Sequence, residues 1–161
     1  MLKPAILYKE QIETFMKERF YTEDMMFETG GICNWIPCIE PYTDNCSVQQ
    51  YAITNNDSEL VGFIMFTIDW YSGNAGQFGL ISFDKGSRYV SLAVREIMHK
   101  LICDYRLHRI EWRMVGGNPA EKHYDYWCKR LGGRKITLRD AFKDKYGDYH
   151  NDHIYEILID D

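Results

Sequence analysis

The feature that most constrains this chain is a change in hydrophobic period near residue 84. Residues 60–71 and 75–83 are rich in apolar, β-branched and aromatic side chains, and Ser72-Gly73-Asn74 between them is a turn signal. Further on, apolar residues recur three and four positions apart, which predicts a helix capped by Asp84 or Ser87. The positions with helical spacing are Val90, Val94, Ile97, Met98, Leu101 and Tyr105. Two antiparallel strands followed by a helix are therefore expected in the middle of the chain.

The sequence continues this pattern on both sides. Residues 110–115 are a strand candidate, and Asn118 and Pro119 just after it favour the start of a helix that runs to residue 131. Further strands are expected at 2–8, 49–54, 134–142 and 150–159, a helix at 9–20, and a short helix with a long loop at 21–47. This order predicts an α+β (mixed α/β) fold, in which one mixed sheet carries helices on both faces, within a single domain of residues 1–161.

Composition excludes several classes of protein. The chain has 161 residues, enough for one domain with its own core, and no apolar run approaches the ~18 residues that span a bilayer. No signal peptide is expected, so we predict a cytoplasmic protein without a membrane partner. The net charge of −5 argues against a nucleic-acid partner, which needs clustered Lys and Arg. The mild acidity fits a cationic amine substrate, but it also fits solubility alone.

Two groups of residues are possible metal ligands, but the spacing of neither group fits a metal site. The five cysteines are an odd number and predict reduced thiols, and Cys33, Cys38 and Cys46 lack the C-x-x-C spacing of zinc ligands. His150 and His153 are three apart on an expected strand, which places them on opposite faces. We therefore expect no metal.

Residues 109–133 carry the most specific pattern. They read R-I-E-W-R-M-V-G-G-N-P-A-E-K-H-Y-D-Y-W-C-K-R-L-G-G: a strand, then Asn118, then a helix with Tyr124 that closes on glycine. This segment resembles the fifth strand and fourth helix of the GCN5-related N-acetyltransferase (GNAT) family, bacterial or phage type. The resemblance covers residues 48–159 well and residues 1–47 only by element order. It implies a GNAT-like fold with a mostly antiparallel sheet of six to seven strands, and acetyl-CoA as the acyl donor.

The resemblance also implies where acetyl-CoA binds. The pantetheine arm lies between the fourth and fifth strands, and the pyrophosphate lies on amides at the start of the following helix. The corresponding positions are Leu80, Ile81, Ser82 and Phe83 on the strand and Lys85, Gly86, Ser87, Arg88, Tyr89 and Val90 in the loop. Family members have small residues where Arg88 and Val90 stand. Either Lys85, Ser87 and Arg88 compensate with charge and a hydroxyl, or cofactor binding is weakened or lost.

The same resemblance assigns roles on the helix after residue 118. Asn118 hydrogen-bonds the pantetheine arm or caps the helix, and Tyr124 is the general acid that protonates the leaving thiolate, with Tyr126 as the alternative. The general base is a carboxylate, for which Asp69 and Glu111 are the candidates.

These assignments predict an N-acetyltransferase that transfers an acetyl group from acetyl-CoA to a primary amine of a small molecule or protein. The alternative is a non-catalytic module of the same fold that binds a ligand or partner. The sequence leaves the acceptor open, and exposed sheet edges can pair two copies into a homodimer.

Overall fold

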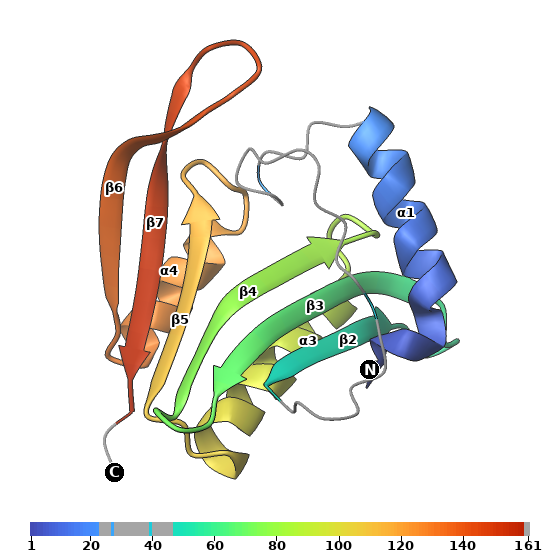
Figure 1. Ribbon diagram of the computed structural model, residues 1–161, viewed down its shortest axis with the longest axis horizontal. Helices are drawn as coiled ribbons and strands as arrows, with labels where there is room; N and C mark the ends of the chain where they lie inside the picture. Colours follow the sequence, from blue (N-terminus) through green and yellow to red (C-terminus); the bar gives the residue numbers. More distant parts are fainter. Residues whose placement is uncertain (23–26, 28–38, 40–46, 160–161) are drawn as a thin grey trace.

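The computed structural model describes residues 1–22, 27, 39 and 47–159. This part of the chain forms one seven-stranded sheet in the order β1-β2-β3-β4-β5-β7-β6 (Figure 1). The strands are β1 (Leu2–Pro4), β2 (Val48–Thr54), β3 (Leu60–Asp69), β4 (Asn74–Ser82), β5 (Arg109–Val115), β6 (Arg134–Lys143) and β7 (Tyr149–Leu158). All neighbours are antiparallel except β4 and β5, which are parallel.

Helices cover both faces of this sheet. Helix α1 (Lys9–Thr22) lies on one face, whereas α3 (Arg88–His99) and α4 (Glu121–Arg130) lie on the other (Figure 1). A π-helical turn, Lys100–Asp104, extends α3. The mixed, mostly antiparallel sheet with helices on both faces confirms the predicted fold class.

The amino-terminal strand is shorter than expected. β1 ends at Pro4, and Ala5–Tyr8 forms a 3-10 turn instead of continuing the strand. Proline lacks an amide hydrogen and fixes φ, here −54°, so the ladder stops there. Leu7 lies within this turn, and its side chain is 69% exposed. Most of the short helix and loop expected at 21–47 lies outside the described residues.

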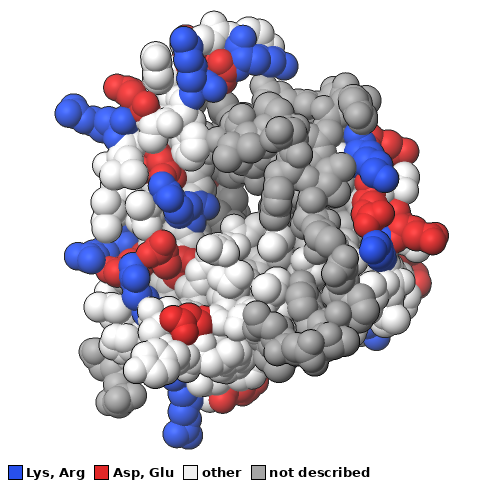
Figure 2. Space-filling model, viewed as in Figure 1, with Lys and Arg blue, Asp and Glu red and all other residues white. Residues whose placement is uncertain are grey.

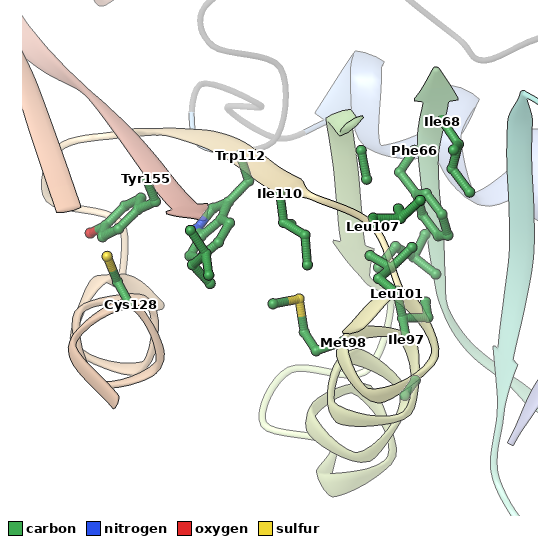
Figure 3. Packing of buried hydrophobic residues seen from close by; sticks show 14 of the residues in the cluster. Phe66, Ile68, Ile97, Met98, Leu101, Leu107, Ile110, Trp112, Cys128 and Tyr155 are labelled. Carbon is green, nitrogen blue, oxygen red and sulfur yellow. The ribbon is translucent and has the colours of Figure 1, made fainter. Parts of the chain in front are cut away.

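Two hydrophobic clusters hold the layers together. On the α3 and α4 side, Ile97, Met98 and Leu101 pack beneath the sheet, and Trp112, Tyr155 and Cys128 gather beside α4 (Figure 3). On the α1 side, Ile12 and Met16 are buried against the sheet. The sheet residues of that second cluster are Ala52, Leu60, Phe63 and Ile81. At ~25 cal/mol per Å² of buried apolar surface, such side chains are the main stabilising term.

Candidate active site

The site is built around a gap between two parallel strands. β4 and β5 pair only where they begin, through Asn74 with Arg109 and Ala75 with Ile110. Beyond these positions the two strands diverge (Figure 1). The other edge of β5 pairs along its whole length with β7. The facing edges of β4 and β5 therefore carry backbone groups with no strand partner, to which an extended ligand can bind as an added strand does.

A β-bulge shapes the β4 edge of this gap. Met65 of β3 pairs with Gly79, and Thr67 pairs with Gly76, so that Phe66 faces two residues of β4, Gln77 and Phe78. Gln77 has a φ of +53°, which is uncommon for a residue other than glycine. A bulge leaves a ladder amide unpaired and bends the strand, and bulges are frequent next to active sites.

The gap opens into a cleft with an empty volume of ≈ 790 Å³, mouth included. Most of its walls come from the α3 and α4 side, where apolar and aromatic side chains prevail. Gly79 and Arg113 lie at the opposite opening, towards the face that α1 covers. Its described lining comprises Phe27, Ile64, Phe78, Gly79, Leu80, Val94, Ile97, Met98, Trp112, Arg113, Met114, Asn118, Tyr124 and Trp127. The lining thus includes residues from both faces of the sheet.

Asn118 stands in the turn between β5 and α4, at the cleft wall. Its Oδ1 accepts a hydrogen bond from the Ala120 amide at 2.9 Å, and its backbone oxygen accepts one from the Glu121 amide at 2.9 Å. The Oδ1 contact closes a turn just before α4, whose N-cap residue is Ala120, so the predicted capping role of Asn118 is wrong. The Asn118 carboxamide nitrogen donates to no described residue. The turn uses the side-chain oxygen of Asn118, which leaves its carboxamide nitrogen to bind a ligand.

Tyr124 enters the cleft from the first turns of α4. Its ring meets those of Trp112 and Tyr155 edge to face, with centroids 5.9 and 6.0 Å apart. Burial raises the pKa of Tyr124 above its ordinary value, so the phenol stays protonated at neutral pH and can donate its proton. Tyr126, by contrast, is 60% exposed and lies beside Arg130, away from this cleft.

A charged cluster fastens α4 to the sheet. Lys135 of β6 donates to Glu121 at 2.7 Å and to Asp125 at 2.9 Å, and the Tyr155 hydroxyl also donates to Asp125 at 2.7 Å. Glu121 accepts the Gly117 amide as well. The hydrogen bond from Lys135 lowers the pKa of Glu121, which remains ionised. These contacts fix the orientation from which α4 presents Asn118 and Tyr124.

The loop before α3 presents an unsatisfied hydroxyl. Ser87 is the N-cap residue of α3, yet its Oγ is buried and has no hydrogen-bond partner in the described part of the chain. Gly86 has a φ of +83°, a conformation that favours glycine. The first amides of a helix lack intrahelical partners, so Ser87 adds a donor to a site already suited to an anion.

The two larger loop residues pack against neighbouring side chains. The Arg88 guanidinium lies over the Tyr89 ring, 5.1 Å from its centroid, and Val90 packs with the core beside Gly62. Next to them, a groove along α3 is lined by Asn56, Arg88, Tyr89, Ser91, Leu92, Arg95 and Trp127. Arg95 and Trp127 were missed in the sequence reasoning, although Arg95 is one turn along α3 from the predicted loop.

The predicted strand positions divide between two faces. Leu80 lines the cleft, whereas Ile81 is buried in the cluster on the α1 side. Ser82 and Phe83 offer their backbone oxygens to Arg19 of α1, at 2.8 and 3.4 Å. Only Leu80 of this predicted strand segment therefore reaches the cleft with its side chain.

The two predicted base candidates lie in different places. Asp69 is at the β3–β4 turn, at the closed end of the gap, where hydrogen bonds from Ser72 and the Tyr71 amide lower the pKa of its carboxyl. Glu111 lies midway along β5 and forms an ion pair with Arg109. Strand alternation puts Glu111 on the same face as Arg113, at the opening towards α1. Neither carboxylate is among the described residues that line the cleft.

No membrane-spanning helix occurs in the described part of the chain. Nor do residues 1–22 and 47–159 bring together three His, Cys, Asp or Glu side chains that could hold a metal ion. Cys33, Cys38 and Cys46 lie outside the described residues. Cys128 is buried, and burial raises the pKa of its thiol.

Comparison with solved structures identifies the fold. Spermidine/spermine N-acetyltransferase SpeG from Vibrio cholerae, solved with manganese ions, superposes with a TM-score of 0.56 at 17% identity, over 71% of this chain and 66% of that one. A probable acetyltransferase gives 0.54 at 20% identity, over 70% and 63%. A dodecameric structure of the Vibrio cholerae spermidine N-acetyltransferase in an intermediate state gives 0.58 at 18% identity, over 71% and 66%.

The chain spans just under two thirds of the length of these structures. No family model and no curated protein matches its sequence. The structural likeness confirms the GNAT-like fold that residues 109–133 predicted.

Proposed function

We propose that this chain transfers an acetyl group from acetyl-CoA to a primary amine. The observation that carries the proposal is the divergence of β4 and β5 into a cleft lined by Asn118 and Tyr124. A pantetheine arm laid in the gap pairs with the free strand edges, and the Asn118 carboxamide nitrogen donates to one of its carbonyls. Acetyltransferases among the structural neighbours support this class of reaction.

The anion site of the proposed cofactor is the start of α3. Arg88 and Val90 stand where related proteins have small residues, but the first rests on Tyr89 and the second packs beside Gly62. The Ser87 hydroxyl, which has no partner among the described residues, donates to a pyrophosphate oxygen once its side chain rotates towards the ligand, and Lys85 and Arg88 supply positive charge nearby. This arrangement favours retained binding over the loss that the altered loop sequence left open.

The proposed chemistry is direct transfer in a ternary complex. The amine nitrogen attacks the thioester carbonyl, the new C–N bond forms, and the C–S bond breaks. Tyr124 donates its proton to the leaving thiolate, for which a half-buried, protonated phenol is suited. The proton released by the amine passes to Glu111, directly or through a water molecule, because Glu111 lies on the face opposite the cofactor.

A non-catalytic module of the same fold is the alternative. It predicts that acetyl-CoA or another ligand binds without turnover. Measuring thiol release from acetyl-CoA with a panel of amines separates the two, because steady release above the buffer rate excludes a purely binding role. Absence of any heat of binding at millimolar acetyl-CoA would instead contradict the proposed cofactor.

Two further proposals concern assembly and location. β6 is an edge strand, exposed along most of its length, and offers a surface for pairing with a second copy. Sedimentation of the purified chain tests a homodimer. A cytoplasmic location remains a proposal from the sequence.

A further inference from the structure

Arg113 brings a positive charge to the opening of the cleft that faces away from α3 and α4. Among the described residues that line the cleft it is the only charged one. Trp112 and Met114, its neighbours on β5, point into the core on the α3 side, so Arg113 points the opposite way. Its side chain is 56% exposed, so a molecule on this face can contact the guanidinium.

A buried carboxylate holds Arg113 in place. Asp152 of β7 is 1% exposed, and its Oδ2 accepts hydrogen bonds from Nε at 3.0 Å and also from Nη2. The Nη1 group donates to no residue in the described part of the chain. An arginine anchored through one edge keeps its other donors in a fixed plane, which is the geometry that binds a carboxylate well. The conformational entropy of the Arg113 side chain is therefore already lost in the free protein, and ligand binding does not have to overcome it.

The acidic residues around Arg113 are already neutralised. Glu111 pairs with Arg109, and Glu156 pairs with Arg109 at 2.8 Å and with Arg134. Arg134 and Arg109 together hold the pKa of Glu156 below its ordinary value. Lys and Arg side chains alternate with Asp and Glu over this β5–β7–β6 half of the sheet (Figure 2). A polycationic amine therefore finds no unpaired carboxylate among these residues.

Building on the proposed acetyltransferase function, we propose that Arg113 binds a carboxylate of the acceptor, which is therefore an amine of the amino-acid type and not a polyamine. The acceptor carboxylate lies on the free edge of the guanidinium, and its amino group reaches through the gap to the thioester. Asp152 acts as a positioning residue, because it contacts Arg113 and not the substrate.

Matched acceptor pairs test this assignment in the whole chain. Initial rates of thiol release from acetyl-CoA are compared for L-ornithine against putrescine and for L-phenylalanine against phenethylamine, because each pair differs only in the carboxylate. We expect kcat/KM to be about tenfold to a hundredfold higher for the amino acid, as a charge-assisted hydrogen bond gives. Equal or better turnover of the two decarboxylated amines would overturn the inference while leaving the transferase function intact.

Variants separate binding from folding. Arg113→Gln alone leaves a buried charge on Asp152, so the double variant Arg113→Gln/Asp152→Asn is the primary test because it keeps the pair neutral. It should bring the ratio within each acceptor pair close to one through a higher KM for the amino acid. Arg139→Gln on exposed β6 is the matched control and should keep the ratio. A double variant that folds and retains the preference for the amino acid contradicts the assignment.

A binding measurement covers the case in which no acceptor turns over. Calorimetry in the presence of CoA compares N-acetyl-L-phenylalanine with N-acetylphenethylamine. Tighter binding of the carboxylate by the wild-type chain, lost in the double variant, supports the Arg113 site even if acetyl transfer fails. Equal affinity for both compounds would overturn it, whatever the outcome of the turnover assay.

Discussion

The ring of Tyr124 on α4 meets the ring of Trp112 on β5 edge to face, with centroids 5.9 Å apart, at the wall of the cleft between β4 and β5. The contact joins the helix and the strand on which the proposed chemistry depends. Tyr124 is half-buried there, and this burial raises the pKa of its phenol, which therefore stays protonated beside the gap.

Replacing Tyr124 with phenylalanine should remove the proton donor without disturbing the packing. General acid catalysis contributes about 10²- to 10⁴-fold, so kcat should fall at least a hundredfold while the Kd for acetyl-CoA stays within a factor of about three. Tyr126→Phe, on the exposed side of α4, is the control and should leave kcat unchanged. Because burial raises the pKa of Tyr124, loss of its proton should not limit the wild-type rate up to pH ~10. An unchanged kcat for Tyr124→Phe contradicts the assignment.

Replacing Ser87 tests the anion site, because its effect on the affinity for acetyl-CoA should differ from its effect on the free energy of unfolding. Its Oγ is buried without a partner among the described residues, so Ser87→Ala should leave the free energy of unfolding unchanged or slightly higher. The affinity for acetyl-CoA should nonetheless fall about fivefold to tenfold in calorimetry, because the pyrophosphate loses a donor. Ser72→Ala is the opposite case: it removes a bonded hydroxyl at the β3–β4 turn and should leave affinity unchanged. Equal affinities of the wild type, Ser87→Ala and Ser72→Ala for acetyl-CoA would exclude Ser87 from the anion site.

Glu111 and Asp69 can be distinguished by their positions. Glu111→Gln should lower kcat about tenfold or more, because the amine then loses its proton acceptor. Asp69→Asn should leave kcat unchanged, since its carboxylate is engaged by Ser72 at the closed end of the gap. Full activity in Glu111→Gln across the pH range would remove it from the mechanism.

Lys135 should matter for stability in a pH-dependent way. Its hydrogen bond lowers the pKa of Glu121, so this contribution is present above the ordinary glutamate pKa of about 4.3 and is lost as the pH falls through the lower, folded-state value. Lys135→Met should therefore lower the free energy of unfolding by about 1 kcal/mol at pH 7 and by less at pH 3. Urea denaturation at the two pH values measures this. Lys129→Met, exposed on α4, is the control, and a pH-independent difference for Lys135→Met contradicts an origin in the Lys135–Glu121 ion pair.

Much of this architecture follows from residue patterns. The change from two β-rich runs to a helical period predicted β3, β4 and α3, because side-chain spacing of two and of three to four residues is imposed by the backbone itself. Pro4 shows the limit of such patterns. The apolar run at residues 2–8 favoured a strand, but the fixed φ of proline ended it.

The motif of the site was predictable from chain order, and the resemblance also implied the gap between the fourth and fifth strands, but not every residue that lines it. Asn118 and Tyr124 follow β5 directly, so their motif could be recognised. Arg113 and Trp127 come to the cleft only because β4 and β5 separate, which no local pattern indicates. One local signal did exist: Gly76 and Gly79 within a predicted strand are typical of the bulge found at Gln77 and Phe78.

The most direct test of the central claim is a single assay of acetyl transfer. The purified chain is mixed with acetyl-CoA and an amine panel that includes amino acids and polyamines, while thiol release and the mass of each acceptor are followed together. We predict steady thiol release matched by acetylated acceptor, and loss of both in Tyr124→Phe. Binding of acetyl-CoA without release for any amine, or release without acetylated acceptor, would contradict the proposed function.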